Sequence, residues 1–201
     1  TGQHHPRNAQ SLVNVAYEAT LTWANPALVT LERQMAVPLF GTRPVEMGVT
    51  VANKGTVLAR IRGDRWYAAR FARAFPGLRR PISWTTIIRS IAAFQRSLVS
   101  ADSRYDRYLR GDLRLTAAEL RGRRLFVSER AECSHCHGSF IFNDQATYVG
   151  APAETPKFHN TGLYNIGGTG AFPVPNRGLF EITGRPEDMG RFRAPSLRNV
   201  A

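Results

Sequence analysis

One short segment of the sequence carries residues suited to a specific chemistry, Cys133-Ser134-His135-Cys136-His137. C-x-x-C-H is the attachment signature of c-type haem, in which both thiols add to the vinyl groups and the His becomes the proximal ligand of the iron. Two Cys three positions apart on a helical turn face the same side, beneath one edge of a porphyrin. The spacing therefore predicts covalent haem c at Cys133 and Cys136, with His137 bound to the iron and His135 exposed.

Other uses of the C-x-x-C spacing are weaker for this chain. A thioredoxin-like redox pair accompanies a βαβ pattern, whereas the segment before Cys133 has a helical pattern. A structural zinc site needs four ligands, and the chain contains only 2 Cys. A chance occurrence of the pattern is the remaining alternative. Because 2 Cys also cannot build a disulfide framework, the fold needs another kind of support.

The composition describes a folded, strongly basic chain. It has 201 residues, 43% of them hydrophobic, and a formal net charge of +12. This length suits one domain of ordinary size or two small ones, and no apolar run approaches the roughly 20 residues of a membrane-spanning helix. Only Lys54 and Lys157 of the 27 basic residues are lysines, and the arginines are spread through every segment. Because a nucleic-acid surface gathers its basic residues on one face, we expect neither a nucleic-acid partner nor a membrane span.

Apolar residues at spacings of three and four predict helices in the first half of the chain. A short helix starts after Pro26 and ends near Pro38, and one or two more lie between Val57 and Pro76-Gly77. The clearest stripe predicts a helix whose apolar side lies in the core. It consists of Trp84, Ile87, Ile88, Ile91, Phe94 and Leu98.

Turn and capping residues predict the elements in the second half of the chain. Residues 103–110 form a short charged helix that Gly111-Asp112 closes, and Thr116 with Glu119 forms a capping box at the start of the next helix. After Gly138, Gly and Pro become frequent and no long period survives, which predicts loop with a short strand or two. So long an irregular stretch needs something to pack around, such as a cofactor. The sequence thus predicts a mainly α fold with long loops and little β structure.

Several blocks beyond the Cys motif occur in a recognisable order. They are RNAQSLVN at 7–14, TW at 22–23, PVEMG at 44–48, FHNTGL at 158–163 and RFRAPSLRNV at 191–200. In this order they resemble the bacterial di-haem cytochrome c peroxidase and MauG superfamily. The peroxidases usually have Trp-Asp-Gly-Arg after an aromatic residue, and this chain departs from that pattern around its TW block. In this respect it looks more like the MbnH-type di-haem enzymes.

The resemblance implies two haems in two mainly helical, cytochrome c-like domains, one haem reacting with peroxide and the other relaying electrons. Residues 1–112 would be the peroxidatic-haem domain, without its own C-x-x-C-H in this chain, and residues 113–201 the C-terminal domain that carries Cys133 to His137. The family's other attachment motif would precede Thr1, and the distal ligand of the second haem, Met or Tyr, would follow Ala201. We therefore expect a chain that is truncated at both ends.

The resemblance also suggests roles for two residues outside the Cys motif. Glu46 matches the carboxylate beside the peroxidatic haem, where a general acid–base group moves a proton from one peroxide oxygen to the other. Trp23 matches the inter-haem Trp and is the candidate electron relay. The alternatives are a surface carboxylate for Glu46 and a packing residue for Trp23.

The resemblance also implies roles for Asn8 and for two arginines. Asn8 matches an Asn that helps to bind calcium between the domains, with backbone carbonyls of residues 193–195 as co-ligands, because Ca²⁺ prefers oxygen donors. The alternative is an Asn that orders a turn. Arg193 and Arg198 are candidates for pairing with haem propionates through bidentate contacts.

Three other histidines lie outside the Cys motif. His4 and His5 fall where some family members carry a displaceable distal His. For His159 we expect support of the haem pocket by hydrogen bonding rather than ligation of iron.

The function that the resemblance implies is that of a di-haem c oxidoreductase. It would react with hydrogen peroxide and, through high-valent haem, oxidise a residue of a partner protein, with Trp as the suggested target. The alternative is a cytochrome c peroxidase that reduces hydrogen peroxide to water with electrons from a small redox protein. A non-catalytic electron-transfer cytochrome with one haem is the hypothesis of another class. Because haem c is attached on the oxidising side of the bacterial membrane, we expect an exported, periplasmic protein.

Overall fold

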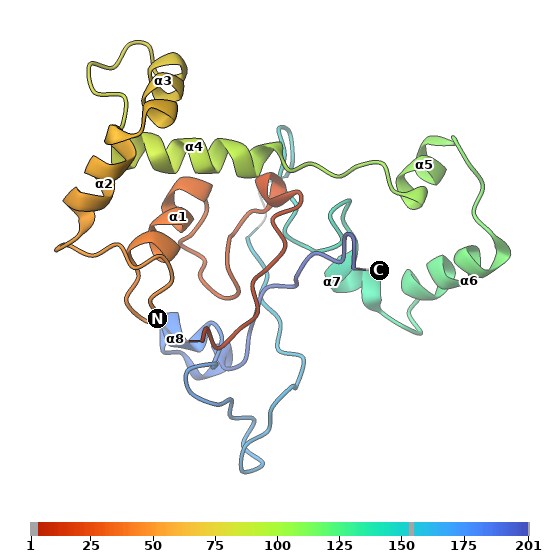
Figure 1. Cartoon of the computed structure of the whole chain (residues 1–201). Coiled ribbons are helices and arrows are strands. Elements are labelled where there is room, and N and C mark those ends of the chain that lie inside the picture. Colours follow the sequence, from red (N-terminus) through yellow and green to blue (C-terminus); the bar gives the residue numbers. More distant parts are fainter. Residues whose placement is uncertain (1–3, 153–154, 201) are drawn as a thin grey trace. The chain divides into compact units, whose positions relative to one another are not determined.

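The computed structural model describes residues 4–152 and 155–200 and is mainly helical (Figure 1). This confirms the predicted fold class. The elements in chain order are η1 (Val15–Tyr17), α1 (Leu31–Phe40), α2 (Lys54–Gly63), α3 (Arg65–Ala74), α4 (Trp84–Ser97), α5 (Arg104–Arg110), α6 (Ala117–Phe126), α7 (Cys133–His137), α8 (Phe180–Thr183) and η2 (Pro186–Asp188). In the described ranges no helix is long and apolar enough to cross a membrane.

The described residues form two compact units. The first contains residues 4–5 and 30–97, and the second contains residues 6–29 and 98–200. These units differ from the predicted domains 1–112 and 113–201, which stay a prediction. The segment 6–29, which carries Trp23 and Asn8, packs with the second unit, the one that also carries the Cys motif.

In the first unit, α1 packs against α4. The helix α1 begins where the Thr30 hydroxyl accepts a hydrogen bond from the Arg33 amide at 3.2 Å, a typical N-cap. Leu31, Met35 and Leu39, four positions apart, are the buried residues of α1. Their spacing places them on one face of the helix, as predicted. The helix begins at Leu31 rather than directly after Pro26, so its predicted start is wrong.

Pro38 lies inside α1, which ends two residues beyond it at Phe40, close to the predicted end. Proline cannot donate a backbone hydrogen bond and usually ends or kinks a helix. Here the last turn continues to Phe40 because Leu39 is buried and the Gly41 amide closes the turn on the Val37 carbonyl at 2.8 Å. Burial of an apolar side chain one residue later therefore outweighs the one missing donor.

The helix α4 is present as predicted, and the residues of the predicted stripe are buried or partly buried except Phe94. Phe94 is 62% exposed, while Thr86 and Gln95 are buried together with Ile87 and Ala92. Thr86 tolerates burial because its hydroxyl donates to the Pro81 carbonyl at 2.7 Å. A prediction from apolar periodicity misses a polar side chain that is buried because it forms a local hydrogen bond.

The helices α2 and α3 contact each other and confirm the expected helices before Pro76. Asp64 separates them. Its carboxylate accepts from the amides of Trp66 at 2.7 Å and Tyr67 at 3.3 Å, which caps the start of α3.

In the second unit, both predicted helix starts of residues 103–126 are capped. Ser103 and Asp106 form a capping box on α5, and Thr116 and Glu119 form one on α6. Gly111 ends α5 in the left-handed conformation, with φ 84°. From residue 138 onward the described chain is largely irregular apart from α8, η2 and short antiparallel bridges such as His159 with Phe192. The predicted long loops are thus confirmed.

Candidate functional site

The Cys motif forms the short helix α7. Its two Cys are free thiols, separated by one helical turn, and burial raises the pKa of the Cys136 thiol. Gly138 follows the helix directly, and a Cβ at this position would lie 2.5 Å from the Ser134 carbonyl oxygen. A residue with a Cβ at position 138 would therefore force the backbone after His137 to shift.

The His137 ring is held by the backbone. Its Nδ1 lies 2.8 Å from the Phe142 carbonyl oxygen. Because a carbonyl can only accept, Nδ1 carries the hydrogen, and in the neutral ring Nε2 then has the free lone pair. This is the tautomer that an iron ligand needs, with the second ring nitrogen oriented by a protein acceptor.

The carbonyl that orients His137 belongs to a tethered turn. Residues 140–142 offer three successive carbonyls to donors from residues 196–198. The bonds are Arg198 Nε to Phe140 at 2.8 Å, Ser196 Oγ to Ile141 at 2.6 Å and Leu197 N to Phe142 at 3.3 Å. Phe142 itself has φ 54°, a region that residues other than glycine rarely adopt. The segment 196–198 thus fixes the turn that supports the candidate ligand.

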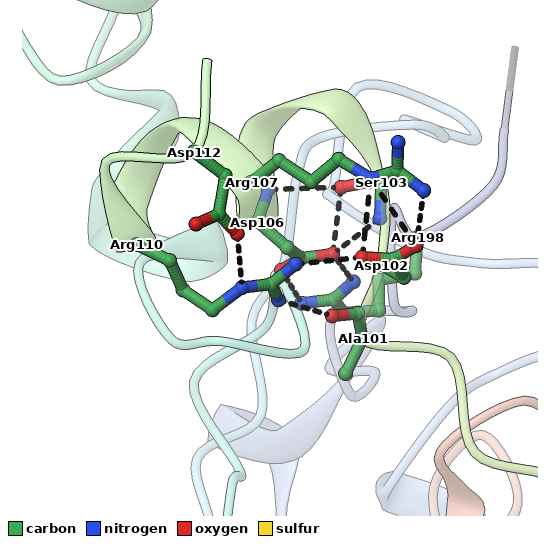
Figure 2. A network of polar contacts seen from close by, with 8 residues as sticks. All are labelled: Ala101, Asp102, Ser103, Asp106, Arg107, Arg110, Asp112 and Arg198. Carbon is green, nitrogen blue, oxygen red and sulfur yellow. Dashed lines mark hydrogen bonds and ion pairs between the residues drawn. The ribbon is translucent and has the colours of Figure 1, made fainter.

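Arg198, a candidate propionate partner, is paired within the protein. Its guanidinium makes two bonds to the Asp106 carboxylate, at 2.9 and 2.7 Å (Figure 2). Bonding to Arg198 holds the pKa of the Asp106 carboxyl well below its usual range. With the bond to Phe140, three of the five N–H donors of this side chain are used.

Arg193, the other propionate candidate, belongs to a buried ion pair. Its guanidinium pairs with Glu18, and the two side chains are 4% and 5% exposed. The Asn143 amide donates to both Glu18 oxygens at 2.9 Å. Burial raises the pKa of Glu18 despite the opposing effects of Arg193 and Asn143. Arg193 Nε also donates to the Thr22 carbonyl at 3.1 Å. Propionate pairing by Arg193 and Arg198 stays a prediction.

Trp23 connects this ion pair to the beginning of the second unit. Its indole Nε1 donates to the Asn8 carbonyl at 2.8 Å, and its own carbonyl accepts from the Arg193 amide at 2.8 Å. The side chain is half-buried. Trp23 is therefore fixed at the ring and at the backbone, next to residues from both ends of the described chain.

The predicted calcium ligand Asn8 is exposed, and its backbone carbonyl is engaged by Trp23. Across the described ranges no group of three or more His, Cys, Asp or Glu residues is arranged to hold a metal ion. The predicted calcium site relies on an Asn and on backbone carbonyls, which are other donors, so it stays a prediction.

Glu46 lies in the first unit, on the loop that follows α1. The side chain is exposed. Two backbone bonds fix the loop to the end of α1, from Met47 to the Pro38 carbonyl at 3.0 Å and from Val49 to the Leu39 carbonyl at 3.2 Å. The predicted site residues are thus divided between the units, with Glu46 in the first and Trp23, Asn8, the Cys motif and both arginines in the second.

The remaining histidines differ in their surroundings. His159 Nε2 lies 2.5 Å from the Asp144 carboxylate, whose side chain is 6% exposed. The expected support of a haem pocket by His159 stays a prediction. His4 and His5 are exposed, and so is His135, as predicted.

A cavity of about 530 Å³ also adjoins α7. It is lined by the intervening residues Ser134 and His135 rather than by Cys133, Cys136 or His137. The side chains that would hold haem therefore do not line this cavity.

Sequence reasoning missed three supporting residues. Asp106 had a detectable signal, since Ser103-x-x-Asp106 matches a helix N-cap pattern. Glu18 and Phe142 had no such signal. An isolated acidic residue has no local pattern that shows its partner, and every residue has a backbone carbonyl.

Comparison with known proteins decides the family. A family model described as di-haem cytochrome c peroxidase matches residues 1–114, more than half of the chain. The chain belongs to the di-haem cytochrome c peroxidase family. Cytochrome-c peroxidase IdrP1 of Denitromonas iodatirespirans is 34% identical, over 99% of this chain and 54% of its own length. Methylamine utilization protein MauG of Methylorubrum extorquens is 30% identical, over 97% and 48% respectively.

Solved structures of the family extend the likeness over nearly the whole chain. The crystal structure of a MauG-like protein associated with microbial copper homeostasis has 57% sequence identity and a TM-score of 0.95, covering 98% of this chain and 56% of that one. The diheme peroxidase BthA from Burkholderia thailandensis shares the fold, with a TM-score of 0.68 at 22% identity over 100% of this chain and 53% of that one. The chain spans about half the length of these di-haem relatives.

The residues of α7 fit one of the haem c groups that this family implies. Two free thiols stand one helical turn apart, and the adjacent His137 has its Nδ1 committed to Phe142. The donor set of thiols and one imidazole Nε2 is that of covalent haem c with a proximal His.

Proposed function

We propose that the full-length protein is a di-haem c oxidoreductase that reacts with hydrogen peroxide and oxidises a residue of a partner protein. The observation that carries this proposal is the 57% identity, over 98% of this chain, to a MauG-like protein associated with microbial copper homeostasis. The resemblance to MbnH-type enzymes makes Trp the residue type to examine first in the partner. We further propose export to the periplasm, where haem c is attached.

Cys133 and Cys136 hold one haem c in this proposal, and a second haem is attached by a motif outside this chain. Bound haem supplies the one-electron chemistry of iron, which side chains alone lack. His137 offers Nε2 to the iron, while its Nδ1 hydrogen bond to Phe142 prevents rotation of the ring. The thiols determine where the group is attached, and His137 with Phe142 determines how the ligand ring is oriented.

Trp23 relays electrons between the two haems in this proposal. Its indole is held through Nε1 by the Asn8 carbonyl, and its backbone by the Arg193 amide. Electron transfer weakens steeply with distance, so an oxidisable ring that cannot drift shortens each step. The buried Glu18–Arg193 pair supports this role because it secures the segment beside Trp23.

Glu46 moves the proton in peroxide cleavage. Its carboxylate takes a proton from one peroxide oxygen and returns it to the other, which leaves as water. The side chain is exposed on a loop that the Met47 and Val49 amides fix to α1, so a small molecule from solvent can reach the carboxylate.

Two structural roles complete the proposal. Asn8, with backbone carbonyls of residues 193–195, binds Ca²⁺. Arg193 and Arg198 pair with haem propionates through guanidinium N–H groups that their buried partners leave unused.

A second candidate function is a peroxidase that reduces hydrogen peroxide to water with electrons from a small redox protein. Relatives with such names favour it. Besides IdrP1, cytochrome c551 peroxidase of Pseudomonas aeruginosa is 30% identical over 99% of this chain and 52% of its own length.

Haem stoichiometry and peroxide turnover of the full-length protein test these functions. Two pyridine haemochromes per chain support a di-haem enzyme, whereas one haemochrome and no peroxide consumption indicate an electron carrier and refute the proposal. The redox state needed for reaction separates the two enzymatic functions. Consumption of peroxide by the fully oxidised protein supports oxidation of a partner protein, and a requirement for prior half-reduction supports the ordinary peroxidase.

A further inference from the structure

The pair of Asp106 and Arg198 is nearly excluded from solvent. The side chains are 11% and 5% exposed, and the closest oxygen and nitrogen are 2.7 Å apart (Figure 2). Asp106 is also fixed within its own helix, since the Ser103 amide and hydroxyl donate to Oδ2 at 2.9 and 2.7 Å. The carboxylate is therefore a rigid partner, and it determines where the guanidinium of Arg198 lies.

Arg198 extends this rigidity to the turn after α7. Its Nε donates to the Phe140 carbonyl at 2.8 Å, and its guanidinium carbon lies 5.6 Å from the centre of the Phe142 ring. The same ring packs against Tyr105 of α5 and Phe126 of α6, with centroids 5.8 and 6.2 Å apart. Both the backbone and the side chain of this turn are thus held by residues far away in sequence.

The turn needs this support because Phe142 has φ 54°. A non-glycine residue in this region is strained and stays there only where its surroundings fix it. Its carbonyl is the acceptor for Nδ1 of His137 at 2.8 Å. If the turn relaxed toward an ordinary conformation, this carbonyl would point elsewhere and the bond would be lost.

We propose that Arg198, held by Asp106, is a positioning residue for His137: it fixes the Phe142 carbonyl and, through it, the orientation and basicity of the ligand ring. This inference rests on the proposed ligation of haem by His137. A stronger acceptor at Nδ1 makes Nε2 a better donor to iron, which favours the oxidised state. Loosening the carbonyl should therefore raise the reduction potential of the haem on α7.

Arg198→Lys in the full-length, haem-loaded protein is the direct test, since it keeps the charge but cannot make both bonds to Asp106 and the bond to Phe140. We expect the midpoint potential of this haem to rise. Weakening one hydrogen bond changes the ratio of oxidised to reduced haem about tenfold at a fixed potential, which is a shift of about 59 mV for one electron. Arg104→Lys is the matched control. It is the same substitution two residues from Asp106, in an exposed pair with Glu119, and it should leave the potential unchanged.

Ser196→Ala is a second variant that alters no charge. It removes the 2.6 Å bond to the Ile141 carbonyl and should raise the potential by less than Arg198→Lys. An unchanged or lowered potential in both variants, with haem content at the wild-type level, overturns the positioning role even if thermal stability falls. An equal shift in Arg104→Lys also overturns it. A wild-type protein without haem on α7 refutes the proposed function itself, which the haem count reveals first.

Discussion

Replacement of Arg193 by Met is expected to destabilise the second unit in a pH-dependent way. Arg193 and Glu18 are 4% and 5% exposed, so the substitution leaves a buried carboxylate with only the Asn143 amide as a strong partner. Breaking a buried pair by removing one member costs about 3–5 kcal/mol. In contrast, Arg96→Met removes an exposed pair with Glu32 and should cost about 1 kcal/mol or less.

The dependence on pH follows from the raised pKa of Glu18, which burial lifts above 4.5 even with Arg193 present. A carboxyl with a raised pKa favours the folded state most below its unfolded value, and this contribution is lost as the pH rises through the folded value. Without Arg193 the pKa rises further. The loss of unfolding free energy should therefore be larger at pH 8 than at pH 5.

Equilibrium urea unfolding followed by circular dichroism at the two pH values measures this difference. The double variant Glu18→Gln with Arg193→Met should recover part of the stability and lose the added pH dependence, because the remaining amide has no charge to bury. A loss of unfolding free energy below about 1 kcal/mol in Arg193→Met would refute the argument from burial. An equal loss at both pH values, unchanged in the double variant, would also refute it.

Three further predictions concern the proposed chemistry in the full-length protein. Glu46→Gln should lower the rate of peroxide consumption about 100-fold or more, whereas the control Glu187→Gln, which changes an exposed carboxylate, should keep the wild-type rate. A wild-type rate in Glu46→Gln would exclude the proton-transfer role. Trp23→Phe should slow electron transfer between the haems, measured by transient absorption, whereas Trp66→Phe, which changes an exposed Trp of α3, should not. An unchanged transfer rate in Trp23→Phe would show that Trp23 is a packing residue. The double variant Cys133→Ala with Cys136→Ala removes both thiols of α7 and should lower the thioether-linked haem from two per chain to one by mass spectrometry, and two linked haems would disprove attachment at α7.

Residues whose role depends on local sequence could be predicted well. The C-x-x-C-H spacing and the capping box of Thr116 with Glu119 act over a few positions, and the structure places both on helices as expected. The last residue of α1 could not be read in this way. Pro38 favours an early end, and only the burial of Leu39 shows why the helix continues.

The supports of the candidate site depend on residues far apart in the chain. Arg193 and Arg198 are two of 25 arginines, and no local pattern shows that their partners are Glu18 and Asp106, which come much earlier in the sequence. The acceptor for His137 is a backbone carbonyl, a group that every residue has. Such contacts follow from tertiary packing, so the sequence could identify the chemical groups but not what holds them.

Addition of hydrogen peroxide to the fully oxidised, full-length protein tests the central claim most directly. The proposed oxidoreductase should consume the first equivalents of peroxide without any reductant, with a change in the haem absorption spectrum on mixing. A protein that leaves peroxide unconsumed until one haem has been reduced would contradict oxidation of a partner protein. A protein that never consumes peroxide would contradict both enzymatic functions.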